Sequence, residues 1–310
     1  MAFDLAAAAL TILGLSLFEI VSGIDNAVIN AEVLRTMSPK GRKWFLWWGI
    51  FIAVFLVRGL LPWVIIWLAV PALGFLGALT ATFSSDHFVV EAIESSAPIL
   101  FMGGGVFLLF LFFHWLFMEP KIYGLHAEKF FQRQGVWFYA VVSIILTLLV
   151  WFSMKRNPVM AFGAVVGSTA FFITHGFKQN AEKAEHEMLH QKHAMSDISK
   201  ILYLEVIDAT FSIDSVLGAF AFTLSIPLIL IGNGIGALVV RQITIGNIER
   251  VKKYKYLKNG AMYSIFCLSL VMVADAFGVH IPAFLSPIIT IAVLGYFFYR
   301  SKKEFQASTS

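Results

Sequence analysis

Charged side chains are scarce in this sequence. Asp, Glu, Lys and Arg make up 14% of the 310 residues, whereas hydrophobic residues make up 59% and the mean hydropathy is +0.80. An ordinary soluble domain has about 25% charged residues. The composition therefore excludes a soluble globular protein and predicts a chain that crosses a lipid bilayer several times.

The sequence also has a single cysteine and lacks a basic segment at its N-terminus. Cys267 is the single cysteine, which excludes a disulfide within the chain. The opening MAFDLAAAAL contains Asp4 and no Lys or Arg, so it predicts a retained first span and not a cleaved signal peptide. The net charge is +4, but the basic residues gather in short connections between apolar runs. That distribution is typical of membrane orientation and gives no reason to expect nucleic acid as a partner.

Nine segments are long and apolar enough for membrane helices, which need about 20 residues. They cover residues 4–33, 44–70, 98–118, 136–154, 159–177, 199–224, 227–246, 261–279 and 282–299. The connections after them hold, in order, four, none, three, two, four, none, five, none and three Lys and Arg residues, where Lys200, at the start of the sixth segment, is counted with the fifth connection. Because the basic side faces the cytoplasm, the sequence predicts an all-α polytopic protein of the inner (cytoplasmic) membrane, with its N-terminus outside and its C-terminus in the cytoplasm.

An acidic pattern occurs twice, in GLSLFEIVSGIDNAVINA and in ILYLEVIDATFSIDSVLGA. The aligned positions are Glu19 with Asp208, Asp25 with Asp214 and Asn26 with Ser215. By the count of basic residues, the two segments cross the membrane in opposite directions. The next span after each carries one embedded arginine, Arg58 or Arg241. We therefore predict an inverted repeat, with copies over about residues 4–118 and 199–299, of the kind that forms midplane sites in many transporters.

The spacing of the acids constrains the helices. Six residues of straight helix separate Glu19 and Asp25 by about 9 Å along the axis and about 120° around it, so the two carboxylates would not face one ligand. We expect the first segment to be interrupted at Gly23, beside Ser22, and the second at Ser212, so that the acids and freed carbonyls turn inward.

Several carboxylates in a medium of low dielectric constant do not all stay ionised without a cation. The expected ligands are Glu19, Asp25, Glu205, Asp208 and Asp214, with Asn26 and Ser215 beside them. Oxygen ligands suit a hard divalent metal ion, with manganese as the first expectation and calcium or magnesium as alternatives. Arg58 and Arg241 are expected to balance charge. The competing interpretation is that these acids only form structural ion pairs with the two arginines.

These segments carry a family resemblance. EIVSGIDNAV and LEVIDATFSIDSVLGAFAFT resemble the two signature segments of the TerC-like integral membrane proteins, particularly a branch catalogued as a domain of unknown function, and VRGLLP and GIGALVVR extend the resemblance. Members of this superfamily are associated with metal-ion homeostasis, chiefly manganese efflux in bacteria. The resemblance implies an exporter built on an inverted repeat, with the same seven residues at its metal site.

Weaker patterns leave alternatives open. The polar loop over residues 178–198 is expected to be cytoplasmic, and its His186, His190 and His193 share one helical face, which fits either a solvated surface or a metal site. His114 lies in an apolar run, as a proton-relay group or as a core residue. The glycines around Gly103 and in GNGIG predict close helix packing.

We therefore expect one integral membrane domain over residues 1–310 that moves a divalent cation, specifically manganese outward, by alternating access, without enzymatic activity. One alternative is a membrane partner that supplies metal to exported proteins without transporting it. Another is an intramembrane aspartate-dependent enzyme. The expected partners are the metal ion and the lipid bilayer, and a homo-oligomer is compatible with the sequence.

Overall fold

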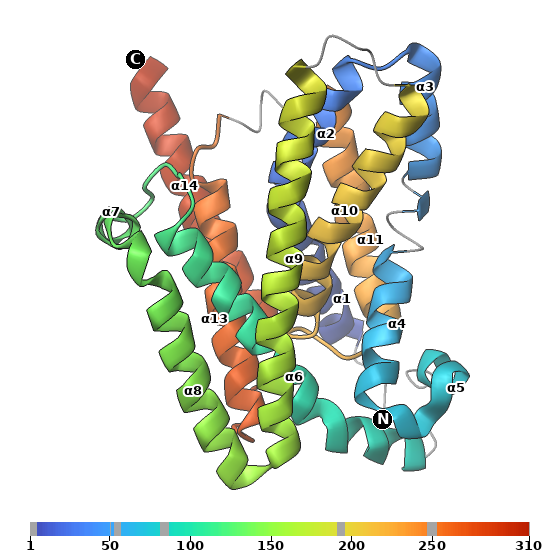
Figure 1. Ribbon diagram of the computed structural model, residues 1–310, viewed down its shortest axis with the longest axis vertical. Coiled ribbons are helices and arrows are strands. Elements are labelled where there is room, and N and C mark those ends of the chain that lie inside the picture. The colour runs from blue at the N-terminus through green and yellow to red at the C-terminus, as the bar shows by residue number, and fades with distance from the viewer. Residues whose placement is uncertain are drawn as a thin grey trace.

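The protein is a bundle of helices. The computed structural model describes residues 5–49, 51–52, 57–80, 87–190, 196–246 and 253–309, and each regular element within these ranges is a helix (Figure 1). Six of these helices are long and apolar enough to cross a membrane, or seven if the bent pair α4 and α5 counts as one. The expected all-α, multi-pass architecture is therefore confirmed.

The six are α1 (Leu5–Ser22), α6 (His87–Phe117), α8 (Phe138–Arg156), α9 (Pro158–His190), α11 (Ile226–Gly246) and α13 (Leu257–Ala276). The others are α2 (Ile24–Arg35), α3 (Pro39–Trp44), α4 (Arg58–Ala69), α5 (Gly74–Thr80), α7 (His126–Arg133), α10 (Asp197–Ala219) and α14 (Leu285–Thr309). The short helices are η1 (Phe45–Gly49), η3 (Pro71–Leu73) and η5 (Gly135–Trp137).

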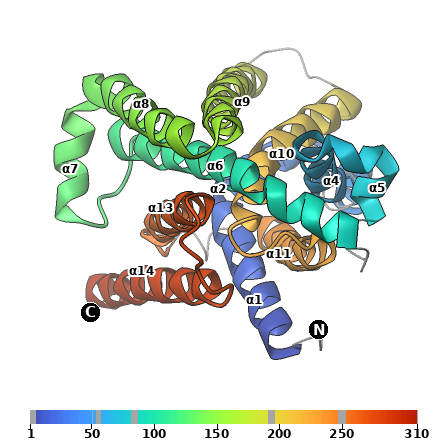
Figure 2. The same cartoon turned by 90° about the horizontal axis from the view of Figure 1, so that it is seen from below.

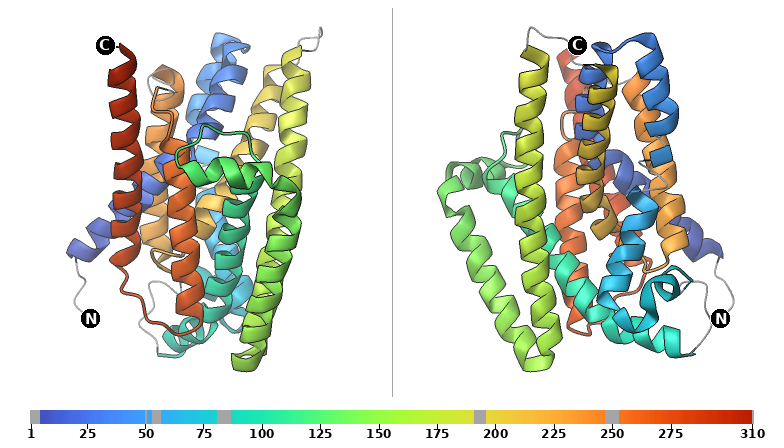
Figure 3. Two further views of the ribbon diagram at one scale, coloured as in Figure 1. Left: turned by 90° about the vertical axis from the view of Figure 1, so that its left-hand side faces the viewer. Right: turned by 45° about the vertical axis from the view of Figure 1, so that its right-hand side comes forward.

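Helices α10 and α14 run alongside the six apolar ones (Figure 3). Helix α10 is too polar to count as a span by composition, because it carries Glu205, Asp208 and Asp214. Helix α14 ends near one end of the long axis (Figure 1). The count of nine spans and the orientation stay predictions.

The helices that carry the repeated pattern interlock. Helix α1 packs against α11, α4 packs against α10, and α6 packs against α13. Close approach of α1 and α11 depends on Gly232 and Gly236. A Cβ at Gly236 would lie 2.5 Å from the Cβ of Glu19, so this glycine fixes how closely α11 approaches the first acid. Helices α8 and α14 lie at the edge of the bundle (Figure 2).

The two expected helix interruptions have different outcomes. Gly23 separates α1 from α2, as predicted, and Figure 3 shows α1 inclined while α2 is more upright. The backbone hydrogen bonds continue through this junction, since the Gly23 N–H donates to the Glu19 carbonyl and the Ala27 N–H to the Gly23 carbonyl, both at 2.9 Å. The interruption expected at Ser212 is wrong. Its hydroxyl donates to the Asp208 carbonyl at 2.6 Å, and α10 continues unbroken.

The polar segment after residue 178 is helical as far as His190, because α9 continues to that residue, which agrees with the expected helical face. Ser196 caps the start of α10, with its hydroxyl accepting from the Ser199 N–H at 3.2 Å. The side chains of His186 and His190, and all of His193, lie outside the described part of the chain. The expected metal site in this loop therefore stays untested.

The backbones of helices α6 and α9 are in close contact at two glycines. A substitution at this contact tests how tightly the two helices pack. A Cβ at Gly167 would lie 2.0 Å from the Gly103 carbonyl oxygen, so Gly167→Ala must push the two helices apart. We expect this variant to lose about 1–3 kcal/mol of unfolding free energy, measured as a lower melting temperature in detergent. The control is Gly176→Ala on the same helix, where an added Cβ meets nothing within 4 Å. Equal melting temperatures for the two variants would contradict the packing.

Candidate cation site

Two carboxylates from distant parts of the chain share one guanidinium. Arg58, at the start of α4, contacts Glu19 of α1 through Nη2 at 2.5 Å and Nε at 3.0 Å, and its Nη1 lies 3.5 Å from Asp208 Oδ2 of α10. Their exposed fractions are 1% for Glu19, 5% for Arg58 and 6% for Asp208. The first acids of the two repeated segments thus converge in a buried cluster.

Asparagines of α2 border this cluster. The side-chain amide of Asn26 donates a hydrogen bond to Asp208 Oδ1. Asn30 lies one helical turn further along and is also buried. Three oxygens here are buried with no hydrogen-bond partner among the described residues: Glu19 Oε2, Asn26 Oδ1 and Asn30 Oδ1. Unsatisfied buried oxygens of this kind are costly, and they are suited to accept a cation or water. Asn30 was missed from sequence, although its i+4 spacing from Asn26 was a usable signal.

Glu205 and Arg241 extend the cluster toward η1. A methyl group at Gly49 would lie 2.4 Å from Glu205 Oε1 and 2.7 Å from Arg241 Nη2, so both side chains lie against this backbone. The Arg241 guanidinium also covers the Phe45 ring at 4.1 Å from its centroid. Neither carboxylate oxygen of Glu205 has a hydrogen-bond partner within the part of the chain that the structure describes. Glu205 therefore adds a third acid to a region that holds two arginines.

Two of the expected ligands, Asp214 and Ser215, do not join this cluster. Asp214 forms an ion pair with Lys178 of α9, and Ser215 donates its hydroxyl hydrogen to the Ser212 carbonyl at 3.1 Å. The reason is geometric. Because α10 is unbroken, residues six positions apart point about 120° away from each other, so Asp208 and Asp214 face different neighbours. Asp25 lies within α2, but its side chain is outside the described set.

The carboxylates are held by arginine in this arrangement. Among the residues that the structure describes, no group of three or more His, Cys, Asp or Glu side chains is placed so that it could hold a metal ion. Arg58 contacts both Glu19 and Asp208, which accounts for this. A cation that uses these carboxylates must therefore compete with the guanidinium.

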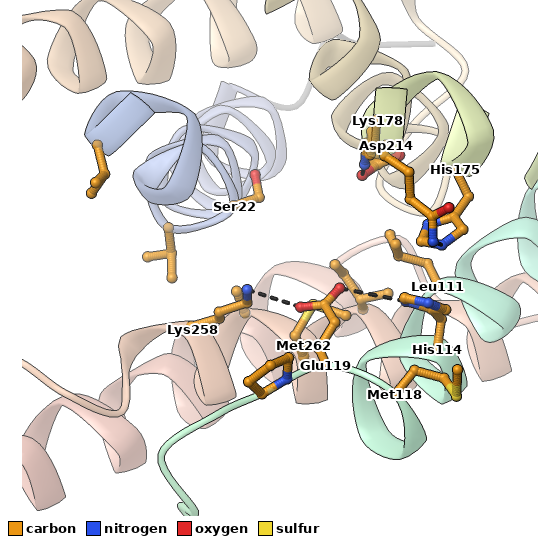
Figure 4. Close-up of a pocket in the computed structure, with 16 residues that line it drawn as sticks. Ser22, Leu111, His114, Met118, Glu119, His175, Lys178, Asp214, Lys258 and Met262 are labelled. Carbon is orange, nitrogen blue, oxygen red and sulfur yellow. Dashed lines mark hydrogen bonds and ion pairs between the residues drawn. The ribbon is translucent and has the colours of Figure 1, made fainter. Parts of the chain in front are cut away.

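A separate cavity of about 550 Å³ opens beside the cluster. It is lined by α6, α9, α10, α13 and the junction of α1 and α2 (Figure 4). Its polar lining residues are Ser22, His114, Glu119, His175, Lys178, Gln179, Asp214 and Lys258. Of these, the sequence predicts a functional side chain only at Asp214 and His114. In the sequence, Lys178 and Lys258 are basic residues of the connections between apolar segments. No pattern in the sequence predicts that they lie beside buried acids.

Glu119 contacts both Lys258 and His114 in this cavity. Its carboxylate lies 2.9 Å from Lys258 Nζ and 3.5 Å from His114 Nδ1 (Figure 4). Burial alone would raise the pKa of Glu119, but the contacts with His114 and Lys258 outweigh burial and bring this pKa well below its usual range. The carboxylate is therefore ionised at neutral pH.

These observations define a multi-pass helical membrane protein with a buried cluster of acids and arginines. The chain belongs to the family described as "Protein of unknown function (DUF475)", whose model matches residues 24–307. It is similar to the uncharacterized membrane protein YceF of Bacillus subtilis (strain 168), with 33% identity over 92 residues. That match covers 30% of this chain and only 36% of YceF. No solved structure matches the chain.

The Arg58 contacts lead to a stability prediction. Arg58→Gln leaves Glu19 and Asp208 buried without their shared cation, which should cost about 3–5 kcal/mol of unfolding free energy. Adding Glu19→Gln and Asp208→Asn to this variant should restore most of the loss, because the uncompensated charges are then gone. Thermal unfolding in detergent measures all three proteins.

The matched control is an ion pair at the surface. Lys255 Nζ lies 3.2 Å from Glu304 Oε1, and both side chains are more than 40% exposed. Lys255→Gln should cost less than about 1 kcal/mol. If Arg58→Gln lowered the unfolding free energy no more than Lys255→Gln does, the buried cluster would not be important for stability.

Proposed function

We propose that this protein moves a divalent metal cation across the inner membrane, with manganese as the expected ion and efflux as the expected direction. The observation that carries the proposal is the meeting of Glu19 and Asp208, from oppositely directed repeats, at one buried arginine. Ionisable groups inside a membrane protein most often mark a substrate pathway. The resemblance of both signature segments to TerC-like proteins supports manganese as the substrate.

The cluster has the charge to attract a cation. The three acids Glu19, Asp208 and Glu205 carry three formal negative charges, and the arginines Arg58 and Arg241 carry two positive ones. The unsatisfied oxygens of Glu19, Asn26 and Glu205 are ligands that manganese, calcium and magnesium accept. Asp25, whose side chain is not described, remains a proposed ligand.

Arg58 gives the site a mechanism for release. When it bridges Glu19 and Asp208, the guanidinium satisfies the carboxylates that an incoming cation needs. When it withdraws, both carboxylates become available for the ion. Exchange of arginine for metal at the interface of the two repeats thus lets the site alternate between a bound and a released state as access changes sides. Arg241, beside Glu205, is proposed to act similarly.

The alternative of an intramembrane enzyme that pairs Asp25 with Asp214 stays a prediction, because the side chain of Asp25 lies outside the described residues. A pair of aspartates that share a proton must lie within hydrogen-bonding distance of each other. Asp208 is bound to Asn26 and Arg58, whereas Asp214 is paired with Lys178. No observation favours a metal-supplying membrane partner over a carrier, and flux separates the two.

Manganese uptake into proteoliposomes tests the proposal. Glu19→Gln and Asp208→Asn each remove a proposed ligand charge and should slow uptake by at least about tenfold, since even the loss of outer partners of a metal ligand costs that much. The control is Glu304→Gln, which changes an exposed carboxylate and should leave uptake unchanged.

Three results would contradict transport through this site. If both site variants carried manganese as fast as the wild type, the cluster would not be the ion site. If the wild type bound manganese in calorimetry but moved none, the metal-supplying partner would replace the carrier. If Glu19→Gln left manganese binding intact while Asp214→Asn abolished it, the site would lie at Asp214.

A further inference from the structure

Two histidines meet at the wall of the cavity described above. The ring centroids of His114, on α6, and His175, on α9, are 3.9 Å apart (Figure 4). Aromatic side chains hold both rings in place. His175 stacks on Phe171 at 5.6 Å with the planes within 6°, and His114 meets the edge of Phe138 at 5.4 Å. The pair is therefore a fixed arrangement, contributed by two tightly packed helices.

The charges that face the pair are balanced when both rings are neutral. By formal charge, Lys178 of α9 and Lys258 of α13 are positive, while Asp214 of α10 and Glu119, after α6, are negative. These four are the charged residues that line the cavity within the described ranges. Glu119 lies 3.5 Å from His114 Nδ1, and the side-chain nitrogen of Gln179 lies 3.0 Å from His175 Nε2. One proton on the pair adds a single positive charge that the Glu119 carboxylate can compensate.

Electrostatic repulsion disfavours a second proton on the pair. It would place two positive charges about 4 Å apart, and at the effective dielectric constant of protein interiors this repulsion separates the two protonation steps by about three pH units. Two rings this close therefore behave as one coupled group.

We propose that His114 and His175 form a site for one proton, which the pair accepts from the water of the cavity and releases in exchange for the transported cation. The proton binds a nitrogen lone pair of one ring, and no other bond changes. Binding at the pair requires no metal and no partner chain.

The exchange with the cation rests on the proposed function and follows from the helices that the two sites share. Ser22 lines the cavity and lies three residues after Glu19, within one turn of α1. Asp214 lines it too and follows Asp208 by six residues, about 9 Å along α10. A positive charge gained at the histidines therefore lowers the affinity of the neighbouring carboxylates for a metal ion.

Proton binding is measured directly by NMR of histidine-labelled protein in nanodiscs, titrated without metal between about pH 4 and pH 9. We expect His114 and His175 to respond together in two steps about three pH units apart. In His175→Gln, His114 should titrate in a single step. His126→Gln, which changes an exposed histidine of α7, should leave the paired titration unchanged.

Either of two results overturns the one-proton site: rings that titrate independently of each other, or rings that take up no proton in this range. The wild-type titration decides between these outcomes even where a variant does not fold.

The link to transport is tested with a pH-sensitive dye inside proteoliposomes. In the wild type, protons should cross the membrane in the direction opposite to manganese. His175→Gln should carry manganese without this proton flux. Equal proton movement in both proteins overturns the exchange. Absence of manganese flux in the wild type refutes the proposed function, while the NMR titration still decides whether the histidines bind one proton.

Discussion

The structure depends on one buried guanidinium. Arg58 lies between Glu19 and Asp208, whose positions in the chain are far apart, and none of the three is exposed by more than 6%. Burying a single charge in this environment is expensive, whereas a well-placed set of opposite charges is tolerated. The packing of α1, α4 and α10 must therefore keep these side chains together, so these helices are held by charge, and α1 is held against α11 by close contacts at glycines.

An unbroken α10 divides the polar interior into two groups. Asp208 faces the arginine cluster, and Asp214, six residues later, faces Lys178 and the cavity. One helix thus borders both the proposed cation site and the proposed proton site. A change of charge on one face of α10 acts on the other over about 9 Å, without any need for a continuous chain of ligands.

The sequence predicted the elements that depend on local chemistry. Scarce charge predicted an all-helical membrane protein, Gly23 marked a helix junction, and the repeated acids predicted that Glu19 and Asp208 would meet. The predicted helix interruption at Ser212 was wrong, because a serine side chain can hydrogen-bond to the carbonyl of the preceding turn and leave the helix unbroken. The Asp214–Lys178 pair was also missed, since Lys178 belongs to a loop by charge but to α9 in the structure. Such pairings depend on tertiary packing, which spacing alone does not specify.

Anomalous X-ray diffraction at the manganese absorption edge, from crystals grown with manganese, would show whether the ion binds between the two acids. We expect an anomalous peak bounded by the carboxylates of Glu19 and Asp208, with the Arg58 guanidinium moved away from both. A peak elsewhere, or none, with Arg58 still bridging the two carboxylates, would contradict this expectation.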